Sequence, residues 1–180
     1  LRAAGLRRYR EKFKAWDLAT AQNVTRFVAN STHTASEVQR CYGRQADVLF
    51  PPVRTDYFTP APGPGHRTDE WLMVSALEPY KRVDLAIAAA GEAKATLVVV
   101  GDGSERGSLE RQAGPGVRFM GRISKERLRH LYRTSRLMVF PQVEDFGISA
   151  AEALACGLPV VARRAGGALD IVDESCGAFF

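Results

Sequence analysis

From residue 71 to residue 173, short apolar runs alternate with amphipathic segments of helical period. Several of these runs are apolar at every position, as in strands that are covered on both faces. The expected strands are 71–75, 96–100, 117–120, 137–140 and 160–162, and the expected helices are 81–90, 104–112, 125–134, 149–156 and 168–173. Strict alternation of strands and helices favours a parallel sheet. The pattern therefore predicts a doubly wound, Rossmann-like α/β domain with helices on both faces.

The residues before this domain divide into a structured part and a linker. The spacing of apolar residues predicts a helix over 1–22, and the segments that follow predict a strand, a helix and a strand at 26–29, 34–42 and 46–50. Residues 51–68 hold five prolines and two glycines, which exclude a regular helix or a central strand. We expect one part at 1–50, a linker at 51–68 and a second domain at 69–180.

The formal net charge is +5, and much of the positive charge falls within 2–14 and 122–136. Both segments have apolar residues among the basic ones, as in solvated helix faces. Contact with an anionic membrane surface stays open. We expect no nucleic-acid partner, because no aromatic-basic RNA motif is present. The three cysteines and three histidines are scattered, so no metal site is predicted. Without an apolar run of bilayer length or a signal peptide, we expect a cytoplasmic protein, with peripheral attachment to the membrane as the alternative.

The ends of the predicted strands carry the residues that suit a ligand. In doubly wound sheets, ligands bind beyond the carboxyl ends of the strands. Those ends are here 75–80, the turn from Gly101 to Gly103, the pair Gly121 and Arg122, the loop 141–147 and the segment 163–167. Most of them contain glycine together with a Lys, an Arg or a carboxylate. We therefore expect a site for a polar, phosphorylated ligand.

Two glutamates stand out within the loop and helix at 141–156. Glu144 lies in the turn after a buried strand, and Glu152 lies early in the helix that follows. Phe146, Gly147 and Ile148 occupy the start of that helix, where backbone N–H groups lack intrahelical partners and attract phosphate or sugar oxygens. The simpler interpretation is that Glu152 complements the helix dipole and that Glu144 is a solvated loop acid.

An ordered set of segments resembles family 4 glycosyltransferases, which have the GT-B fold and retain anomeric configuration. Glu144 and Glu152 fit the family's two glutamates separated by seven residues. Other matching segments, in the same order, are 27–31 (FVANS), 51–58 (PPVRTDYF), 75–84 (SALEPYKRVD), 100–103 (VGDG), 119–123 (FMGRI) and the glycine pair at 166–167. The resemblance covers nearly the whole chain. It implies transfer of a hexose from a nucleotide diphosphate sugar. We expect no metal ion to be required, because no Asp-x-Asp motif lies in a suitable loop and cationic side chains can neutralise the diphosphate.

The resemblance also assigns roles to residues. Lys81 would bind the donor diphosphate, whose negative charge grows as it leaves; the alternative is that Lys81 is the first residue of an exposed helix. Glu152 would hold the ribose hydroxyls. Glu144, with the backbone at 146–148, would contact the donor sugar. Gly121, Arg122 and Ile123 would lie near the base; the alternative is that Arg122 is a surface residue.

One position departs from the family pattern. Ala76 stands where the family usually has an arginine that also binds the diphosphate. Three alternatives follow: Lys81 with its neighbour Arg82 carries the charge, another cation reaches in, or activity is reduced. Arg163 and Arg164 are the candidate substitutes, because they end a strand beside the same crevice. Asp170 replaces the commoner glutamate, which is a milder change.

By this resemblance, residues 1–50 would be the last part of an acceptor domain, and the chain would be a piece of a longer enzyme, binding the donor but inactive in transfer by itself. The apolar side of the first helix, with Leu6, Tyr9, Phe13 and Trp16, would then lack its normal neighbours. It would be exposed, mediate association or pack in a non-native way. The segment 78–84 looks like that of mannosyltransferases of polysaccharide or glycolipid assembly, so GDP-mannose is the first expectation and UDP-hexoses are the second. Two alternatives remain: a sugar-nucleotide epimerase of the same architecture, and a non-catalytic scaffold that binds a nucleotide sugar.

Overall fold

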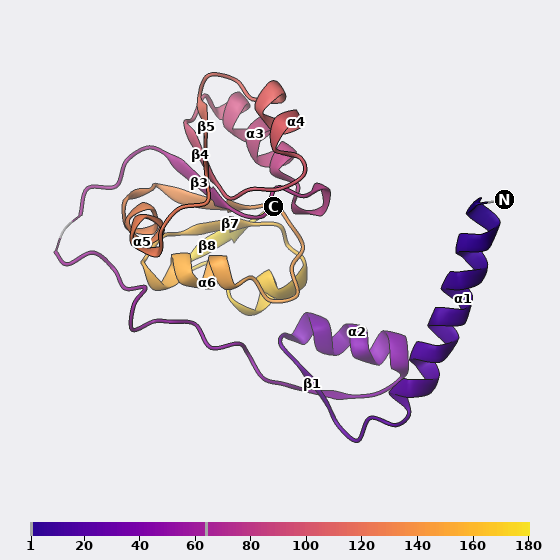
Figure 1. Ribbon diagram of the computed structural model, residues 1–180. Helices are drawn as coiled ribbons and strands as arrows, with labels where there is room; N and C mark the ends of the chain where they lie inside the picture. The colour runs from indigo at the N-terminus through magenta and orange to yellow at the C-terminus, as the bar shows by residue number, and fades with distance from the viewer. Residues whose placement is uncertain (1, 64) are drawn as a thin grey trace. The chain divides into compact units, whose positions relative to one another are not determined.

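The computed structural model describes residues 2–63 and 65–180, with side chains described at 9–63 and 65–180. The chain divides into two compact units, the first extending to Phe50 and the second beginning at Pro51 (Figure 1). None of the described helices combines the length and the apolar character that crossing a bilayer requires.

The first unit is a small β-α-β arrangement preceded by a long helix. Its elements are α1 (Arg2–Ala21), β1 (Phe27–Ala29), α2 (Thr32–Tyr42) and β2 (Ala46–Val48). The two strands are parallel, and α2 is the crossover between them. The hydroxyl of Tyr42 donates to Oδ2 of Asp17 at 2.9 Å, which ties α2 to α1.

The aromatic side of α1 is exposed, which is one of the three alternatives for this face. Tyr9, Phe13 and Trp16 expose 76%, 59% and 59% of their surface, whereas the side chain of Leu6 lies outside those described.

The second unit is a six-stranded parallel sheet between helices, which confirms the predicted fold class. The strands are β3 (Trp71–Val74), β4 (Leu97–Val100), β5 (Val117–Gly121), β6 (Leu137–Phe140), β7 (Val160–Ala162) and β8 (Gly177–Phe179). The helices are η1 (Pro79–Lys81), α3 (Val83–Ala93), α4 (Arg106–Gln112), α5 (Lys125–Thr134), α6 (Ile148–Ala155) and η2 (Gly166–Asp170). In Figure 1, α3 and α4 lie on one side of the sheet and α5 and α6 on the other.

Each central strand contributes to two cores, because successive side chains of a strand point to opposite faces. Leu72, Val98 and Met138 belong to the core on one face, together with residues of α5 and α6. Their neighbours Met73, Val99 and Val139 belong to the core on the other face, together with residues of α3. This arrangement explains why the strands are apolar at consecutive positions.

Three predictions about the elements were wrong in detail. The predicted helix at 81–90 is instead the 3-10 helix η1 followed by α3, with Arg82 between them in a left-handed conformation at φ 53°. The predicted helix at 168–173 is the 3-10 helix η2. The edge strand β8 was not predicted, since its three residues form no apolar run.

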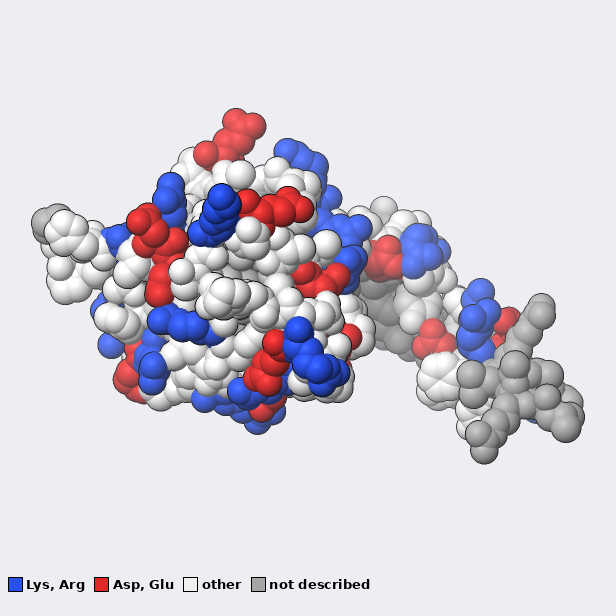
Figure 2. All heavy atoms as spheres, turned by 90° about the horizontal axis from the view of Figure 1, so that it is seen from above, with Lys and Arg blue, Asp and Glu red and all other residues white. Residues whose placement is uncertain are grey.

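The segment 51–68 has no helix or strand among its described residues, yet it is held firmly against α5. Arg133 donates from Nε to the carbonyl of Thr59 at 2.7 Å. Arg67 donates to the carbonyl of Ser135 at 2.8 Å and to that of Gly157 at 2.6 Å. Part of the basic character of the sequence around α5 therefore serves internal contacts. On the face that Figure 2 draws, Lys and Arg side chains are interspersed with Asp and Glu side chains rather than gathered together.

Two glycines at the start of η2 let two backbone segments approach each other closely. The N–H of Gly167 donates to the carbonyl of Glu144 at 2.8 Å. A Cβ atom added at Gly166 would lie 2.6 Å from that carbonyl oxygen, and one at Gly167 would lie 2.5 Å from the carbonyl oxygen of Phe146. The loop 143–146 thus rests directly on this glycine pair, which has no space for a side chain.

This close approach predicts that Gly167→Ala destabilises the fold by about 2 kcal/mol or more, because a backbone segment must move to admit the methyl group. Thermal denaturation of the chain measures the effect. Gly91→Ala in α3 is the matched control: nothing lies within 4 Å of its added Cβ, and alanine is favoured over glycine in a helix by about 1 kcal/mol. Equal melting temperatures for the two variants would contradict the prediction.

Candidate functional site

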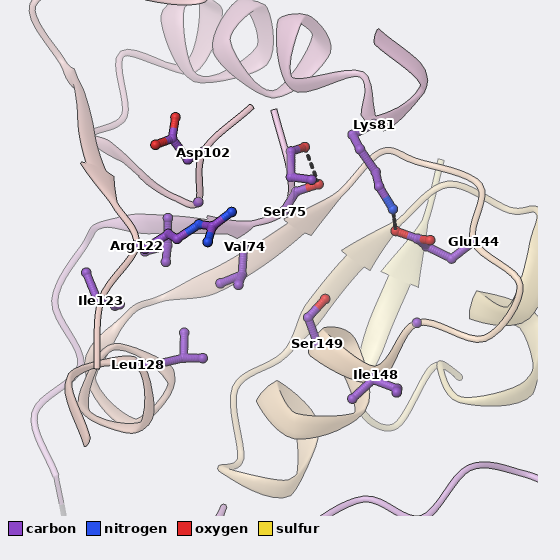
Figure 3. Close-up of a pocket in the computed structure, with 14 residues that line it drawn as sticks. Val74, Ser75, Lys81, Asp102, Arg122, Ile123, Leu128, Glu144, Ile148 and Ser149 are labelled. Carbon is purple, nitrogen blue, oxygen red and sulfur yellow. Dashed lines mark hydrogen bonds and ion pairs between the residues drawn. The ribbon is translucent and has the colours of Figure 1, made fainter. Parts of the chain in front are cut away.

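A cavity of about 640 Å³ opens at the carboxyl ends of the strands, at the point where the strand order reverses. β3 pairs with β4 on one side and with β6 on the other, and the chain runs outward to both sides from β3. Such reversal points open a crevice in doubly wound sheets. The walls come from the ends of β3, β4 and β5, from η1 and α5, and from the start of α6 (Figure 3).

Lys81 and Glu144 meet at one wall of this cavity. Lys81 ends η1, and its Nζ forms an ion pair with Oε1 of Glu144. The two side chains are only 12% and 25% exposed. Nζ also lies 4.6 Å from the ring centroid of Tyr80. Lys81 is therefore a cavity residue held by a short 3-10 turn, not the first residue of a helix.

Arg122 enters the same cavity from another wall. It follows β5 and lies opposite Lys81 in Figure 3. No carboxylate forms an ion pair with Arg122 in the part of the chain that the structure describes. Ala76 lines the cavity as well, with a methyl group where a cation is missing. Arg122 thus brings an unneutralised positive charge to the cavity that contains Ala76.

Arg82, Arg163 and Arg164, which were predicted to replace the charge missing at Ala76, do not line the cavity. Arg82 turns to Asp84, with Nη2 2.9 Å from Oδ2, and this hydrogen bond holds the pKa of the Asp84 carboxyl below its usual range. Arg164 places its guanidinium 4.7 Å from the ring centroid of Phe179. Arg163 is exposed and is not part of the lining.

The first turn of α6 forms another part of the wall. Gly147 precedes this helix with φ 105°, a conformation that favours glycine, and an added Cβ would lie 3.1 Å from Cζ of Phe140. Ile148 and Ser149 line the cavity, and the backbone N–H groups of a first helical turn have no intrahelical partners. Phe146 is buried and does not line it, so only its backbone remains for the predicted contact.

The turn Gly101–Gly103 shapes the cavity through its backbone. The N–H of Gly101 donates to the carbonyl of Gly121 at 2.9 Å, which joins the ends of β4 and β5. Gly101 lines the cavity, whereas Gly121 and Gly103 do not. An added Cβ at Gly103 would lie 2.5 Å from the carbonyl oxygen of Leu77, so this glycine permits close packing of two loops.

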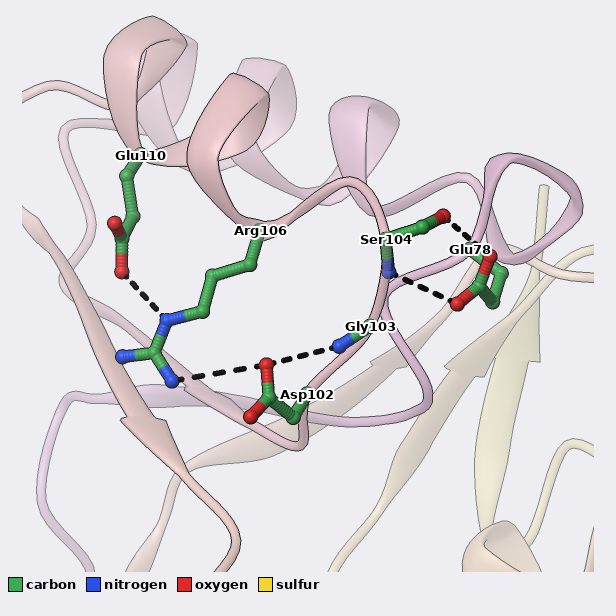
Figure 4. A network of polar contacts seen from close by, with 6 residues as sticks. All are labelled: Glu78, Asp102, Gly103, Ser104, Arg106 and Glu110. Carbon is green, nitrogen blue, oxygen red and sulfur yellow. Dashed lines mark hydrogen bonds and ion pairs between the residues drawn. The ribbon is translucent and has the colours of Figure 1, made fainter.

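A polar network fixes the same turn from outside the cavity (Figure 4). Oδ1 of Asp102 accepts from the N–H of Gly103 at 3.0 Å and lies 3.8 Å from Nη1 of Arg106. The carboxylate of Glu78 accepts from the backbone and from the hydroxyl of Ser104, at 2.9 and 2.6 Å. The hydrogen bond from the Ser104 hydroxyl is the largest cause of the lowered pKa of Glu78, and the bond from the Ser104 backbone is the next. Asp102 therefore borders the cavity in a fixed orientation.

Glu152 lies beside the cavity rather than in its wall. It is three residues after Ser149, and residues at this spacing share one face of a helix. Oε2 accepts from the hydroxyl of Tyr132 at 3.3 Å. Burial raises the pKa of the Glu152 carboxyl, and the Tyr132 hydroxyl opposes that shift.

Ser75, Asp102, Leu128 and Ser149 line the cavity and were not among the predicted site residues. Ser75 and Asp102 directly follow strands, a position that could have identified them. Leu128 and Ser149 lie on helices, where sequence alone does not indicate which face meets the cavity. Among the described residues, no group of three or more His, Cys, Asp or Glu side chains is arranged to hold a metal ion.

The chain resembles known glycosyltransferases in sequence. D-inositol 3-phosphate glycosyltransferase 2 of Catenulispora acidiphila is 33% identical, over 83% of this chain and 42% of the relative. The D-inositol 3-phosphate glycosyltransferase of Mycobacteroides abscessus is 28% identical, over 84% of this chain and 40% of the relative. The chain therefore spans about two fifths of the length of these curated relatives.

Solved structures resemble the chain in fold. Anabaena HepE, in complex with UDP and glucose, has a TM-score of 0.77 at 23% identity, over 94% of this chain and 54% of that chain. The pneumococcal O-GlcNAc transferase GtfA, in complex with UDP and GlcNAc, has a TM-score of 0.72 at 20% identity, over 92% and 35%. The fold is that of GT-B glycosyltransferases. The family model described as "Glycosyl transferases group 1" matches residues 61–180, and the chain belongs to this family.

Proposed function

We propose that this chain binds a nucleoside diphosphate hexose in the cavity between β3 and β6, as the donor half of a retaining hexosyltransferase of family 4. One observation carries the proposal: Lys81, Arg122 and the first turn of α6 border a single cavity at the strand reversal. All three attract anions, and a diphosphate is an anion that a cavity of this size accommodates. The UDP held by the solved relatives supports a nucleotide ligand.

In the proposed complex, each residue has a distinct task. The diphosphate lies between Lys81 and Arg122, whose charges stabilise it as it leaves. Glu144, once separated from Lys81, accepts hydrogen bonds from sugar hydroxyls beside Gly147 and Ile148. Glu152 accepts hydrogen bonds from the ribose.

The proposed reaction replaces one bond to the anomeric carbon by another on the same face of the sugar. The bond from that carbon to the diphosphate oxygen breaks, and a bond to the acceptor hydroxyl oxygen forms. The hydroxyl proton passes to the departing diphosphate. We propose mannose as the hexose, because residues 78–84 resemble the corresponding segment of mannosyltransferases. The proposed acceptor is a glycan or a lipid-linked sugar.

Titration of the chain with GDP, UDP, GDP-mannose and UDP-glucose by calorimetry tests the donor site. We expect saturable binding of one nucleotide, weakened roughly tenfold or more by Lys81→Ala and by Arg122→Ala, because each removes a charged contact worth about 1.5–3 kcal/mol. Arg82→Ala is the matched control, since Arg82 pairs with Asp84 outside the cavity. We expect it to change the affinity less than about twofold.

An equal loss in all three variants would contradict the proposed role of the cavity. A folded chain that binds none of the four compounds would contradict donor binding itself. Binding of the donor by a complete enzyme that never transfers its sugar would favour the non-catalytic scaffold.

The raised pKa of Glu152 predicts opposite effects of Glu152→Gln on binding and on stability. A carboxyl whose pKa is higher in the fold stabilises the fold below its unfolded pKa of about 4.3, and this contribution is lost as the pH rises through the folded pKa. Glutamine cannot ionise. We expect the variant to melt at a higher temperature than the wild type at pH 7, with the difference shrinking towards pH 4. Its nucleotide affinity at pH 7 should fall. A difference in melting temperature that does not depend on pH would contradict this assignment.

We also propose that binding needs no divalent metal, because two cations border the cavity. The measured affinity should be the same after exhaustive treatment with a chelator. A loss of binding that magnesium or manganese restores would contradict metal independence.

A further inference from the structure

The segment before β3 packs against one end of Tyr132. Phe58 is only 4% exposed, and its ring meets that of Tyr132 edge to face at a centroid distance of 5.7 Å. Arg133, the next residue of α5, donates to the carbonyl of Thr59 at 2.7 Å. Arg129, one turn earlier, places its guanidinium 4.2 Å from the ring centroid of Tyr57. One face of α5 therefore packs against residues 57–59 and binds them.

The other end of Tyr132 reaches Glu152. Its ring is fully buried, and its hydroxyl donates to Oε2 of Glu152 at 3.3 Å. Leu128 lies one helical turn before Tyr132 on α5, and it lines the cavity. Ser149 lies one turn before Glu152 on α6, and it lines the cavity too. The hydrogen bond thus lies one turn below the cavity wall, in the interface between the two helices.

We infer that Tyr132 is a positioning residue that couples the docking of residues 57–59 to the strength of donor binding, through its contacts with Phe58 and Glu152. The inference rests on the proposed function, in which Glu152 holds the ribose. Phe58 holds the tyrosine ring in place, and the ring directs its hydroxyl at the carboxylate. When residues 57–59 are undocked, the hydroxyl loses its orientation, and so does the carboxylate.

The charges around Glu152 support this role. The groups that face it are Tyr132 and Lys125 from α5 and Cys156 from its own helix. Burial raises the pKa of Glu152, whereas the Tyr132 hydroxyl and the Lys125 charge lower it. Burial also raises the pKa of Tyr132 well above its usual value, so the hydroxyl remains a donor. Tyr132 therefore donates the hydrogen bond that favours the ionised form of this half-buried carboxyl and gives it a direction.

Residues 1–50 contain two contacts of the same kinds as those of Tyr132, and these serve as controls. Tyr42 also donates to a carboxylate, that of Asp17, at 2.9 Å. Phe27 also packs on this tyrosine, with a centroid distance of 5.6 Å. Tyr42→Phe and Phe27→Leu therefore make the same chemical changes as Tyr132→Phe and Phe58→Leu at a place that does not border the cavity.

The first experiment follows the carboxyl carbon of Glu152 by NMR during a pH titration of the ligand-free chain, with Glu152→Gln identifying the resonance. Tyr132→Phe should raise the midpoint of the Glu152 titration by about half a unit or more, and Tyr42→Phe should leave it unchanged. An unchanged midpoint in Tyr132→Phe, or equal shifts in both variants, overturns the positioning role. This measurement needs no nucleotide, so it stands even where the proposed function fails.

The second experiment measures the affinity for UDP and GDP from pH 5 to pH 8. Tyr132→Phe and Phe58→Leu should each weaken the binding of whichever nucleotide the wild type prefers by about twofold to tenfold at pH 7. They should also move the loss of binding at acidic pH to a higher pH, while Phe27→Leu changes neither quantity. Equal effects of Phe58→Leu and Phe27→Leu overturn the coupling. If Phe58→Leu does not fold, Arg133→Lys, which weakens the contact with the carbonyl of Thr59, decides the same question. A wild type that binds neither nucleotide overturns the proposed function, and the carboxyl titration still decides whether Tyr132 positions Glu152.

Discussion

β3 is paired with β4 and with β6, and the rest of the second unit is arranged around that double pairing. Its residues Leu72 and Met73 supply one side chain to each of the two cores, so both layers of helices depend on this strand. The chain leaves β3 towards one side and returns on the other side at β6. The loops beyond the two strands must therefore separate, and the cavity lies where they do. The cavity is thus a consequence of topology, and the residues at its edge determine what it binds.

Close backbone approaches hold these loops in place. Gly166 and Gly167 support the loop that carries Glu144, and the turn with Gly101 and Gly103 packs against the extension of β3. At each of these glycines, backbone atoms lie so close that a side chain would not fit. The cavity can therefore present charged residues without relying on those charges for its shape. Backbone contacts thus hold the loops, while Arg122 forms no ion pair with any carboxylate of the described residues.

Much of the fold could be predicted because its signals are local. The bounds of α5, β6 and β7 agree with the predicted 125–134, 137–140 and 160–162, since apolar spacing and flanking residues mark them. The break at Arg82 depends on a left-handed conformation that the sequence does not indicate, and Lys81 reaches the cavity because of that break. The positive charge that Ala76 lacks was sought at Lys81 and Arg82 or at the end of β7. Arg122 lies near it only in space, and spacing in one sequence carries no such information. The contact between Tyr132 and Glu152 was missed for the same reason.

The ion pair between Lys81 and Glu144 has a consequence for the order of events in the proposed reaction. In the structure the lysine already has an anionic partner, so the proposed diphosphate must compete with Glu144 for it. In the proposed complex, a complete donor offers sugar hydroxyls to the displaced carboxylate. A nucleotide without its sugar offers none, so Glu144 would return to Lys81. The proposed site would therefore favour the complete donor over the nucleotide by-product, because Glu144 competes for the lysine.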